Sequence, residues 1–198
     1  SYNTAVGREA LKANTTGANN TAVGYNALYS NTTGSSNTAS GYQALTSNTT
    51  GTYNTAIGRN TLYYNTTGAN NAAVGYAALQ SNTTGTYNTA NGYEALYSNT
   101  TGANNTALGY AAGDNITTGS SNIIIGSGVD APSATASNQL NIGNTIYGDM
   151  STGNVHLGAS TTQSQKLYVT GAIYATGDIT AFSDERIKDN IQEIPNAL

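Results

Sequence analysis

Charged residues are scarce in this 198-residue sequence. Asp, Glu, Lys and Arg make up 8% of the chain, against roughly a quarter in typical soluble domains. Leu, Ile, Val and Phe together number thirty. So low an apolar content would suggest disorder if the net charge were large, but the formal net charge is −4. The composition is therefore compatible with an ordered fold that has a thin core of small residues.

Cysteine is absent, which excludes disulfide bonds and thiolate metal sites. The single histidine, His156, lies among alternating apolar residues, where a packed or surface role is more usual than a ligand or base. We expect no metal and no cofactor. No apolar run has the about 20 residues that span a membrane, and no signal peptide is visible. We therefore expect no membrane insertion. Because basic residues are few and unclustered, we also expect no nucleic-acid partner.

What the sequence does contain is a repeat of 17 residues, typified by NTAVGYNALYSNTTGSS at residues 20–36. Each of four positions in this unit recurs every 17 residues, namely Asn20, Ala22, Gly24 and Leu28. An Asn-Thr-Thr-Gly segment closes each of the first six units. Such a pattern predicts one structural unit stacked on copies of itself, because a single unit cannot bury its apolar side alone.

Each unit begins with a short alternating segment, such as residues 21–25, that fits a strand better than a helix. Asn-Thr-Thr-Gly is typical of a corner in which Gly adopts positive φ. We expect a coil of two short strands and two corners, with the Ala and Leu columns pointing inward and stacking from coil to coil. At about 4.8 Å per strand, seven or eight coils over residues 1–126 would extend on the order of 35 Å.

The repeated Asn-Thr-Ala-Val-Gly-Tyr, with Ala and Gly at fixed offsets, resembles the left-handed parallel β-roll of trimeric autotransporter adhesin heads. It also resembles related arrays in phage tail fibres. The resemblance covers residues 1–126, although the adhesin unit is generally shorter. It implies an all-β fold, a left-handed parallel β-roll or solenoid, and a homotrimer that would give the thin core a second layer.

Five tyrosines share one register of the repeat, and arginine replaces tyrosine in two other units, at Arg8 and Arg59. The tyrosines are Tyr25, Tyr42, Tyr76, Tyr93 and Tyr110. One interpretation is an aromatic ladder that stacks on sugar rings or on another receptor. The other, which is the more usual reason for exposed strand tyrosines, is that they stack on their own neighbours. Both remain open, and these five tyrosines are candidate receptor-binding residues.

The Asn-Thr-Thr triplets match acceptors for N-glycosylation, although a corner role is the more usual one. The acceptor positions are Asn14, Asn31, Asn48, Asn65, Asn82 and Asn99. A regular threonine array could also order water, as ice-binding solenoids do. Tyr, Asn and Gly interrupt any flat threonine face, so this interpretation ranks below the others.

Beyond residue 126 the side-chain period is lost, and residues 128–137 have the composition of a loop. Short apolar alternations follow, each ended by Gly, Asp or Thr, and they predict β segments of about four to six residues. In chain order they are at 140–143, 146–148, 155–158, 167–169 and 173–175. The segments at 154–158, 166–171 and 175–179 resemble the neck of phage tail fibres and tailspikes, where three chains interweave. The resemblance implies that residues 127–182 form such a β neck.

The composition changes again at residues 183–198, where six of the sixteen charged residues lie between Asp184 and Glu193. Ser183 is suited to be a helix N-cap, and apolar residues recur at helical spacing as far as Pro195. From these features alone, the segment is a short C-terminal helix with ordinary surface charges.

Residues 181–191, AFSDERIKDNI, closely resemble the start of the intramolecular chaperone domain of endosialidase tailspikes and many tail fibres. In that family the domain trimerises the fibre, and a Ser-Lys dyad then cuts a Ser-Asp bond. The matching residues are Ser183, Asp184 and Lys188. The resemblance implies self-cleavage without turnover, in which a lysine of lowered pKa activates the serine hydroxyl.

These resemblances favour a structural, receptor-binding trimeric tail fibre that mediates adsorption of a phage or phage-like particle to the host surface. Its partners would be a host glycan or protein and other tail or baseplate proteins, and its location the virion or an extracellular particle. The alternative is a trimeric autotransporter adhesin on a bacterial cell surface.

An enzyme such as a glycan depolymerase needs paired carboxylates. The carboxylates before Phe182 are instead scattered along the sequence, at Glu9, Glu94, Asp114, Asp130, Asp149 and Asp178. We therefore do not expect an enzyme.

Overall fold

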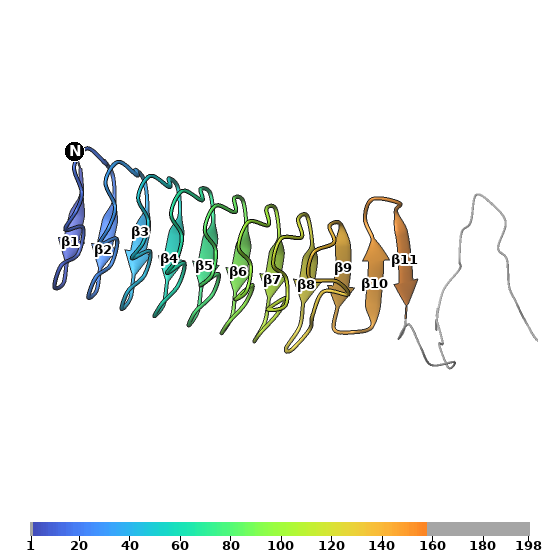
Figure 1. The fold of residues 1–198 in the computed structure, drawn as a ribbon. Helices are drawn as coiled ribbons and strands as arrows, with labels where there is room; N and C mark the ends of the chain where they lie inside the picture. The colour runs from blue at the N-terminus through green and yellow to red at the C-terminus, as the bar shows by residue number, and fades with distance from the viewer. Residues whose placement is uncertain (1, 158–198) are drawn as a thin grey trace, which may run out of the picture. The chain divides into compact units, whose positions relative to one another are not determined.

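The computed structural model describes residues 2–157, which form one sheet of eleven strands in sequence order (Figure 1). The first eight strands have three residues each: β1 Thr4–Val6, β2 Thr21–Val23, β3 Thr38–Ser40, β4 Thr55–Ile57, β5 Ala72–Val74, β6 Thr89–Asn91, β7 Thr106–Leu108 and β8 Ile123–Ile125. Three strands of four residues follow: β9 Gln139–Ile142, β10 Ile146–Asp149 and β11 Asn154–Leu157.

Strands β1 to β9 are parallel, and each pairs with the next in a register of 17 residues. Ala22 therefore lies beside Ala39, and Ala39 beside Ala56. Each repeat forms one coil, and successive coils stack as a parallel β-solenoid. The all-β class and the solenoid of 17-residue repeats are confirmed.

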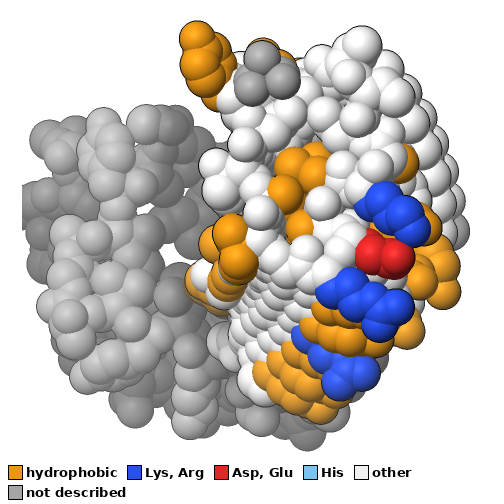
Figure 2. Space-filling model, turned by 90° about the vertical axis from the view of Figure 1, so that its left-hand side faces the viewer, with side chains coloured by type: hydrophobic (Ala, Val, Ile, Leu, Met, Phe, Trp, Pro, Cys, Tyr) orange, Lys and Arg blue, Asp and Glu red, His pale blue; other side chains and the backbone are white. Residues whose placement is uncertain are grey.

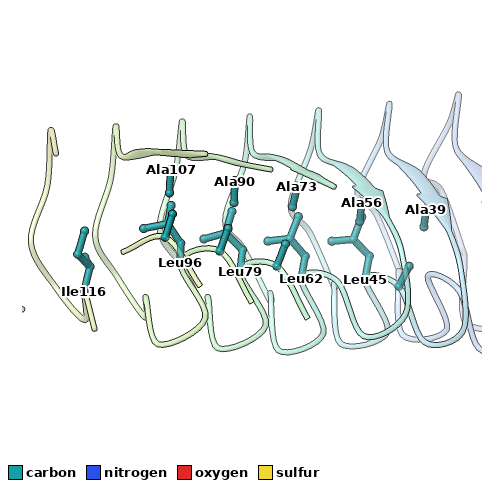
Figure 3. Packing of buried hydrophobic residues seen from close by; sticks show 14 of the residues in the cluster. Ala39, Leu45, Ala56, Leu62, Ala73, Leu79, Ala90, Leu96, Ala107 and Ile116 are labelled. Carbon is teal, nitrogen blue, oxygen red and sulfur yellow. The ribbon is translucent and has the colours of Figure 1, made fainter. Parts of the chain in front are cut away.

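One narrow core runs through the stack of coils. The central alanine of each strand from β2 to β7 and the leucines from Leu28 to Leu96 are at most 1% exposed. Figure 3 shows these side chains in two facing rows, with Leu45 near Ala56 and Leu62 near Ala73. Full burial of a leucine contributes about 1.5–3 kcal/mol. The predicted inward stacking of the two columns is confirmed.

The second strand predicted for each coil is not formed in the part of the chain that the structure describes. The segment with Leu28 does bond from coil to coil, since the Leu28 amide donates to the Ala44 carbonyl at 3.0 Å. However, Asn26 and Leu28 have φ values of 54° and 52°. Alternate left-handed residues turn the chain where a strand would be extended. This turn closes the coil within 17 residues and keeps the leucine inside, and the burial offsets a backbone cost of about 1 kcal/mol.

A glycine column marks a close approach of consecutive coils. Gly24 has a φ of 133°, and a Cβ atom on it would overlap the carbonyl oxygen of Gly41. Gly41 has the same relation to Gly58. The repeat therefore requires glycine here, both for the backbone conformation and for the contact.

Buried asparagines connect the coils through two further columns. Asn37 Nδ2 donates to the Gly51 carbonyl at 2.8 Å, and the Asn37 backbone N–H donates to Asn20 Oδ1 at 3.0 Å. Asn37 Oδ1 in turn accepts from the Asn54 backbone N–H at 3.0 Å. In the second column, Asn48 Nδ2 donates to Asn31 Oδ1 at 2.8 Å and to the same Gly51 carbonyl at 3.1 Å. An amide side chain has both a donor and an acceptor. Asparagine can therefore form hydrogen bonds with a buried carbonyl and a buried N–H group at the same time, which leaves neither without a partner.

The backbone register continues one coil past residue 126, although the side-chain repeat does not. Strand β9 pairs in parallel with β8, so that Ile124 lies beside Asn141. Strands β10 and β11 then continue the sheet as antiparallel neighbours. The first three β segments predicted after the loop are thus observed. Residues 158–182 of the predicted neck and the predicted helix at 183–198 lie outside the described residues, and the interweaving of three chains stays a prediction.

Candidate functional site

The register tyrosines lie on the outer surface, at the bend that follows each strand. Tyr25 is typical, because it comes directly after Gly24, where the chain turns at the end of β2. Its four equivalents, Tyr42, Tyr76, Tyr93 and Tyr110, are between 39% and 58% exposed. Stacking of identical coils brings the five residues into one column, as their shared register indicated.

Most of these rings stack on one another. The ring centroids of Tyr76 and Tyr93 are 4.9 Å apart with an interplanar angle of 11°, and those of Tyr93 and Tyr110 are 5.1 Å apart at 9°. Tyr25 and Tyr42 form a similar pair, at 5.1 Å and 13°. Near-parallel rings at these distances attract each other. The column is therefore held in order by its own contacts.

The two arginines continue the column instead of interrupting it. The guanidinium carbon of Arg59 lies 5.3 Å from the ring centroid of Tyr42 and 5.9 Å from that of Tyr76. That of Arg8 lies 5.7 Å from the Tyr25 centroid. These are cation–π distances. We call the column of these two arginines and the five tyrosines the Tyr/Arg ladder, and Figure 2 shows cationic and hydrophobic side chains gathered on one flank of the molecule.

The stacking limits what the ladder can bind. Neighbours cover the ring faces inside the ladder, so a sugar ring cannot lie flat on them, and the groups left for a ligand are ring edges, hydroxyls and guanidinium N–H groups. Desolvation, followed by the nearby Glu94, raises the pKa of Tyr93 above its ordinary value of 10.0. The ladder therefore presents hydrogen-bonding groups at intervals of one coil, together with two cations.

A small ion-pair cluster lies in the first coil. Lys12 Nζ donates to Glu9 Oε1 at 2.9 Å and lies 5.3 Å from the Tyr29 ring centroid. The hydrogen bond to Glu9 is the main reason that the pKa of Lys12 is raised. The charge of Glu9 is thus compensated within its own coil.

A second column on the outer surface consists of exposed apolar side chains, which we call the outer apolar column. Its members are Val6, Val23, Ile57, Val74 and Leu108, all between 40% and 58% exposed. Each is the third residue of its strand and points away from the side of the central alanine, which is buried in β2, β4, β5 and β7. Ser40 and Asn91 take this position in β3 and β6. The alternation Thr-Ala-Val could have revealed this column, since an inward alanine requires an outward valine.

The structure brings together two of the scattered carboxylates. Burial, followed by a hydrogen bond to Asp130, raises the pKa of Asp114 to about 6, and Glu94 adds a smaller electrostatic contribution. Sequence separation had hidden this proximity, because Asp114 and Asp130 lie on adjacent coils. Among residues 2–157, no group of three or more His, Cys, Asp and Glu side chains could hold a metal ion.

The Asn-Thr-Thr triplets lie in bends, as predicted, but the glycine that ends each corner does not adopt the expected positive φ. The residue two places later does, with φ of 59° at Ser36. Glycine is needed at Gly34 for space instead, because a Cβ atom would overlap Asn31 Oδ1 and the Gly51 carbonyl oxygen. Asn31, Asn48, Asn65, Asn82 and Asn99 are 0% exposed. The Nδ2 atom of Asn65, which a glycan would modify, already donates to Asn48 and to the Gly68 carbonyl. Glycosylation needs a surface side chain, so these five positions are structural in the folded coil.

The predicted self-processing residues, Ser183, Asp184 and Lys188, lie outside the described residues, and their role stays a prediction. Within residues 2–157 there is no helix with the length and apolarity needed to cross a membrane. No protein-family model matches the chain, and comparison with curated proteins and with solved structures also gives no match.

Proposed function

We propose that the chain is part of a homotrimeric, receptor-binding tail fibre through which a phage or phage-like particle adsorbs to its host surface. In this proposal the solenoid is a left-handed β-roll, the segment after it is an interwoven β neck, and residues 183–198 begin a cleavable chaperone. The observation that carries it is the outer apolar column.

The outer apolar column has the character of a covered surface. Its side chains are aliphatic and substantially exposed in the isolated chain, and they recur on β1, β2, β4, β5 and β7. No strand from β1 to β8 contains a charged residue. Exposed apolar patches on soluble proteins mark interaction sites, and this column is interrupted by two uncharged residues, Ser40 and Asn91.

A second and third copy of the same chain suit this strip. The column repeats once per coil, so a copy aligned in the same direction presents aliphatic side chains at the same spacing. Closed symmetry lets the same surface elements be used by every subunit. The Tyr/Arg ladder lies at a different position of the coil and can stay exposed for a receptor.

Oligomeric state tests the proposal directly. Sedimentation equilibrium should give three times the chain mass of 20.2 kDa. Val23→Lys combined with Val74→Lys would place charges in the interface and should yield monomers with an unchanged circular dichroism spectrum. The matched control is Thr50→Lys with Thr84→Lys, at exposed corner positions of the same stack, which should remain trimeric. A monomeric wild-type chain would overturn the proposal.

The processing step has its own test, because catalysis in this proposal is at most one self-cleavage between Ser183 and Asp184. Expression of the full-length gene should give a product that ends at Ser183. Ser183→Ala or Lys188→Ala should abolish this product, and an intact wild-type chain under native conditions would count against processing. The tail at residues 181–191 supports a fibre over the cell-surface adhesin, which remains the alternative.

A further inference from the structure

Arg59 is an isolated charge in the middle of the Tyr/Arg ladder. Between Lys12 and Glu94 the sequence contains no other Asp, Glu, Lys or Arg. The coils on either side of Arg59 are therefore uncharged, and each coil adds about 4.8 Å to its distance from the next ionised group. Toward the C-terminus the next charged residue, Glu94, belongs to the second coil beyond that of Arg59, about 10 Å along the stack.

The guanidinium group of Arg59 is held in place but not neutralised. Its guanidinium carbon lies between the rings of Tyr42 and Tyr76, at 5.3 Å and 5.9 Å from their centroids. The one ion pair among residues 2–157 joins Lys12 to Glu9, so Arg59 has no carboxylate partner in that range. Its side chain is exposed. The exposed guanidinium therefore has N–H donors that no carboxylate of residues 2–157 pairs with.

Such an edge is suited to an acidic group. The N–H groups of a guanidinium form a rigid fork that matches the two oxygens of a carboxylate or phosphate, and charge-assisted bonds of this kind are about twice as strong as neutral ones. The aromatic sandwich restricts the side chain before any ligand arrives. This restriction lowers the entropy that binding would otherwise cost.

We propose that Arg59, between Tyr42 and Tyr76, binds the acidic group of an anionic surface polysaccharide. The inference rests on the proposed receptor-binding function and names the chemistry of its ligand. A polysaccharide fits better than a protein, because the ladder is a straight column without an apolar pocket, whereas protein interfaces have an apolar core. Exposed tyrosine edges on both sides of Arg59 can receive neutral sugar units while Arg59 receives the charged one.

Arg8 is the weaker of the two ladder cations for this purpose. It stacks on Tyr25 and is followed directly by Glu9. The acidic side chain adds a negative charge beside it, and Lys12 holds that carboxylate in the same coil. Arg8 also contacts one ring of the ladder, whereas Arg59 lies between two, and Glu94 stands two coils from Arg59 instead of beside it.

The test uses the full chain and two acidic polymers, polygalacturonate for a carboxylate source and poly(glycerol phosphate) for a phosphate source. Methyl-esterified polygalacturonate is the uncharged match of the first polymer. In titration calorimetry at low ionic strength, the wild type should bind at least one acidic polymer and should bind the methyl ester at least about tenfold more weakly. Which polymer binds identifies the source of the acidic group.

Arg59→Tyr is the decisive variant, because tyrosine occupies this position in five other coils and restores an unbroken stack. It should lower affinity for the acidic polymer about tenfold, as expected when a charge-assisted bidentate bond is lost. Arg59→Lys should be intermediate, since it keeps the charge without the fork. Arg8→Tyr, the matched control, should change affinity less than about twofold.

Equal binding of wild type and Arg59→Tyr, equal binding of the acidic polymer and its methyl ester, or no binding to either acidic polymer would each overturn the inference. Its failure differs from failure of the proposed function. A trimer without Arg59-dependent binding refutes the ligand class alone. A monomer that binds polymer through Arg59 refutes the trimeric fibre alone.

Discussion

Ile116 lies over Gly113 in the seventh coil, so that its Cδ1 atom is 3.3 Å from where a Cβ atom would stand on Gly113. Every earlier coil has leucine at the Gly113 position and asparagine at the Ile116 position. In the seventh coil the apolar side chain therefore comes from Ile116 instead of from a leucine. The loss of leucine at Gly113 breaks the sequence repeat, but Ile116 fills the space in the core.

This exchange predicts that the two positions are coupled. Gly113→Leu alone should destabilise the fold by about 1–3 kcal/mol through overpacking, and Ile116→Ala alone by about 2–4 kcal/mol through a cavity. In the double variant the leucine fills that cavity, so the loss should fall below the sum by about 1 kcal/mol or more. Urea unfolding of all three variants measures the coupling.

The control for this cycle is Gly113→Ala, which tests the backbone separately from the volume. Gly113 has a φ of 61°, similar to that of the leucines in other coils. The alanine variant should lose no more than about 1 kcal/mol. Strict additivity of Gly113→Leu and Ile116→Ala would show that Ile116 does not occupy the space of the missing leucine.

Asn48→Ala should be strongly destabilising because it breaks the asparagine column at two coils. The change removes the donor to Asn31 Oδ1 and the acceptor of Asn65 Nδ2. Buried groups left without a partner cost about 1–3 kcal/mol each, so we expect a loss of about 2–4 kcal/mol in thermal or chemical unfolding. Thr50→Ala, at an exposed position of the same corner, should change stability by less than about 0.5 kcal/mol. Similar losses for the two variants would contradict a structural role of the column.

Titration of Asp114 should make the stability of the fold depend on pH. Its folded-state pKa is about 6, above the ordinary value of 3.8, because of burial and the neighbouring Asp130. The folded chain then holds this proton more tightly than the unfolded chain, so stability falls as pH rises from about 4 to about 6 and stays lower above that range. Asp114→Asn should remove this fall and stabilise the neutral-pH fold by about 0.5 kcal/mol, the scale of partly exposed charge interactions.

Asp149 gives a control of opposite sign for the same melting series. Hydrogen bonds from Ser151 lower its pKa. Its contribution to stability is therefore present at neutral pH and is lost as pH falls through the lowered pKa. Asp149→Asn should give no stabilisation at neutral pH. An Asp114→Asn variant with an unchanged pH profile would show that Asp114 and Asp130 do not interact in solution.

Gly75→Ala and Gly128→Ala should separate steric overlap from backbone strain. Both glycines have positive φ, at 136° and 62°. A Cβ atom on Gly75 would overlap the Gly92 carbonyl, whereas one on Gly128 meets nothing within 4 Å. We expect a loss of about 3 kcal/mol or more for Gly75→Ala and about 1 kcal/mol for Gly128→Ala. Equal losses in chemical unfolding would mean that the coils are farther apart than the glycine column indicates.

The sequence predicted the stacked columns because identical spacing leaves few choices for Ala22, Gly24 and Leu28. It did not predict the conformation of Leu28, because positive φ is unusual for leucine and is imposed by closure of the coil. The continuation into β9 was also missed, since Gln139 and Asn141 keep the backbone bonds of the repeat without its side chains. Backbone hydrogen bonding is largely independent of side-chain identity, and so leaves little trace in composition.

The candidate site was predicted in part, for a related reason. The register placed Tyr76 and Tyr93 in one column, but the sequence left open whether their faces would be free. Stacking at one coil spacing answers this, and it also explains why Arg59 can replace a tyrosine. The proximity of Asp114 to Asp130 required knowledge that the register persists past residue 126.

The 17-residue register makes length a quantised property of this molecule. Deletion or duplication of one whole repeat would bring equivalent coils next to each other. Every column of stacked side chains would therefore form again, with one residue fewer or more. Unequal crossing-over between the near-identical repeats of the gene could therefore adjust the reach of the stack in steps of about 4.8 Å. Such changes would vary the number of tyrosine rungs without requiring a new fold.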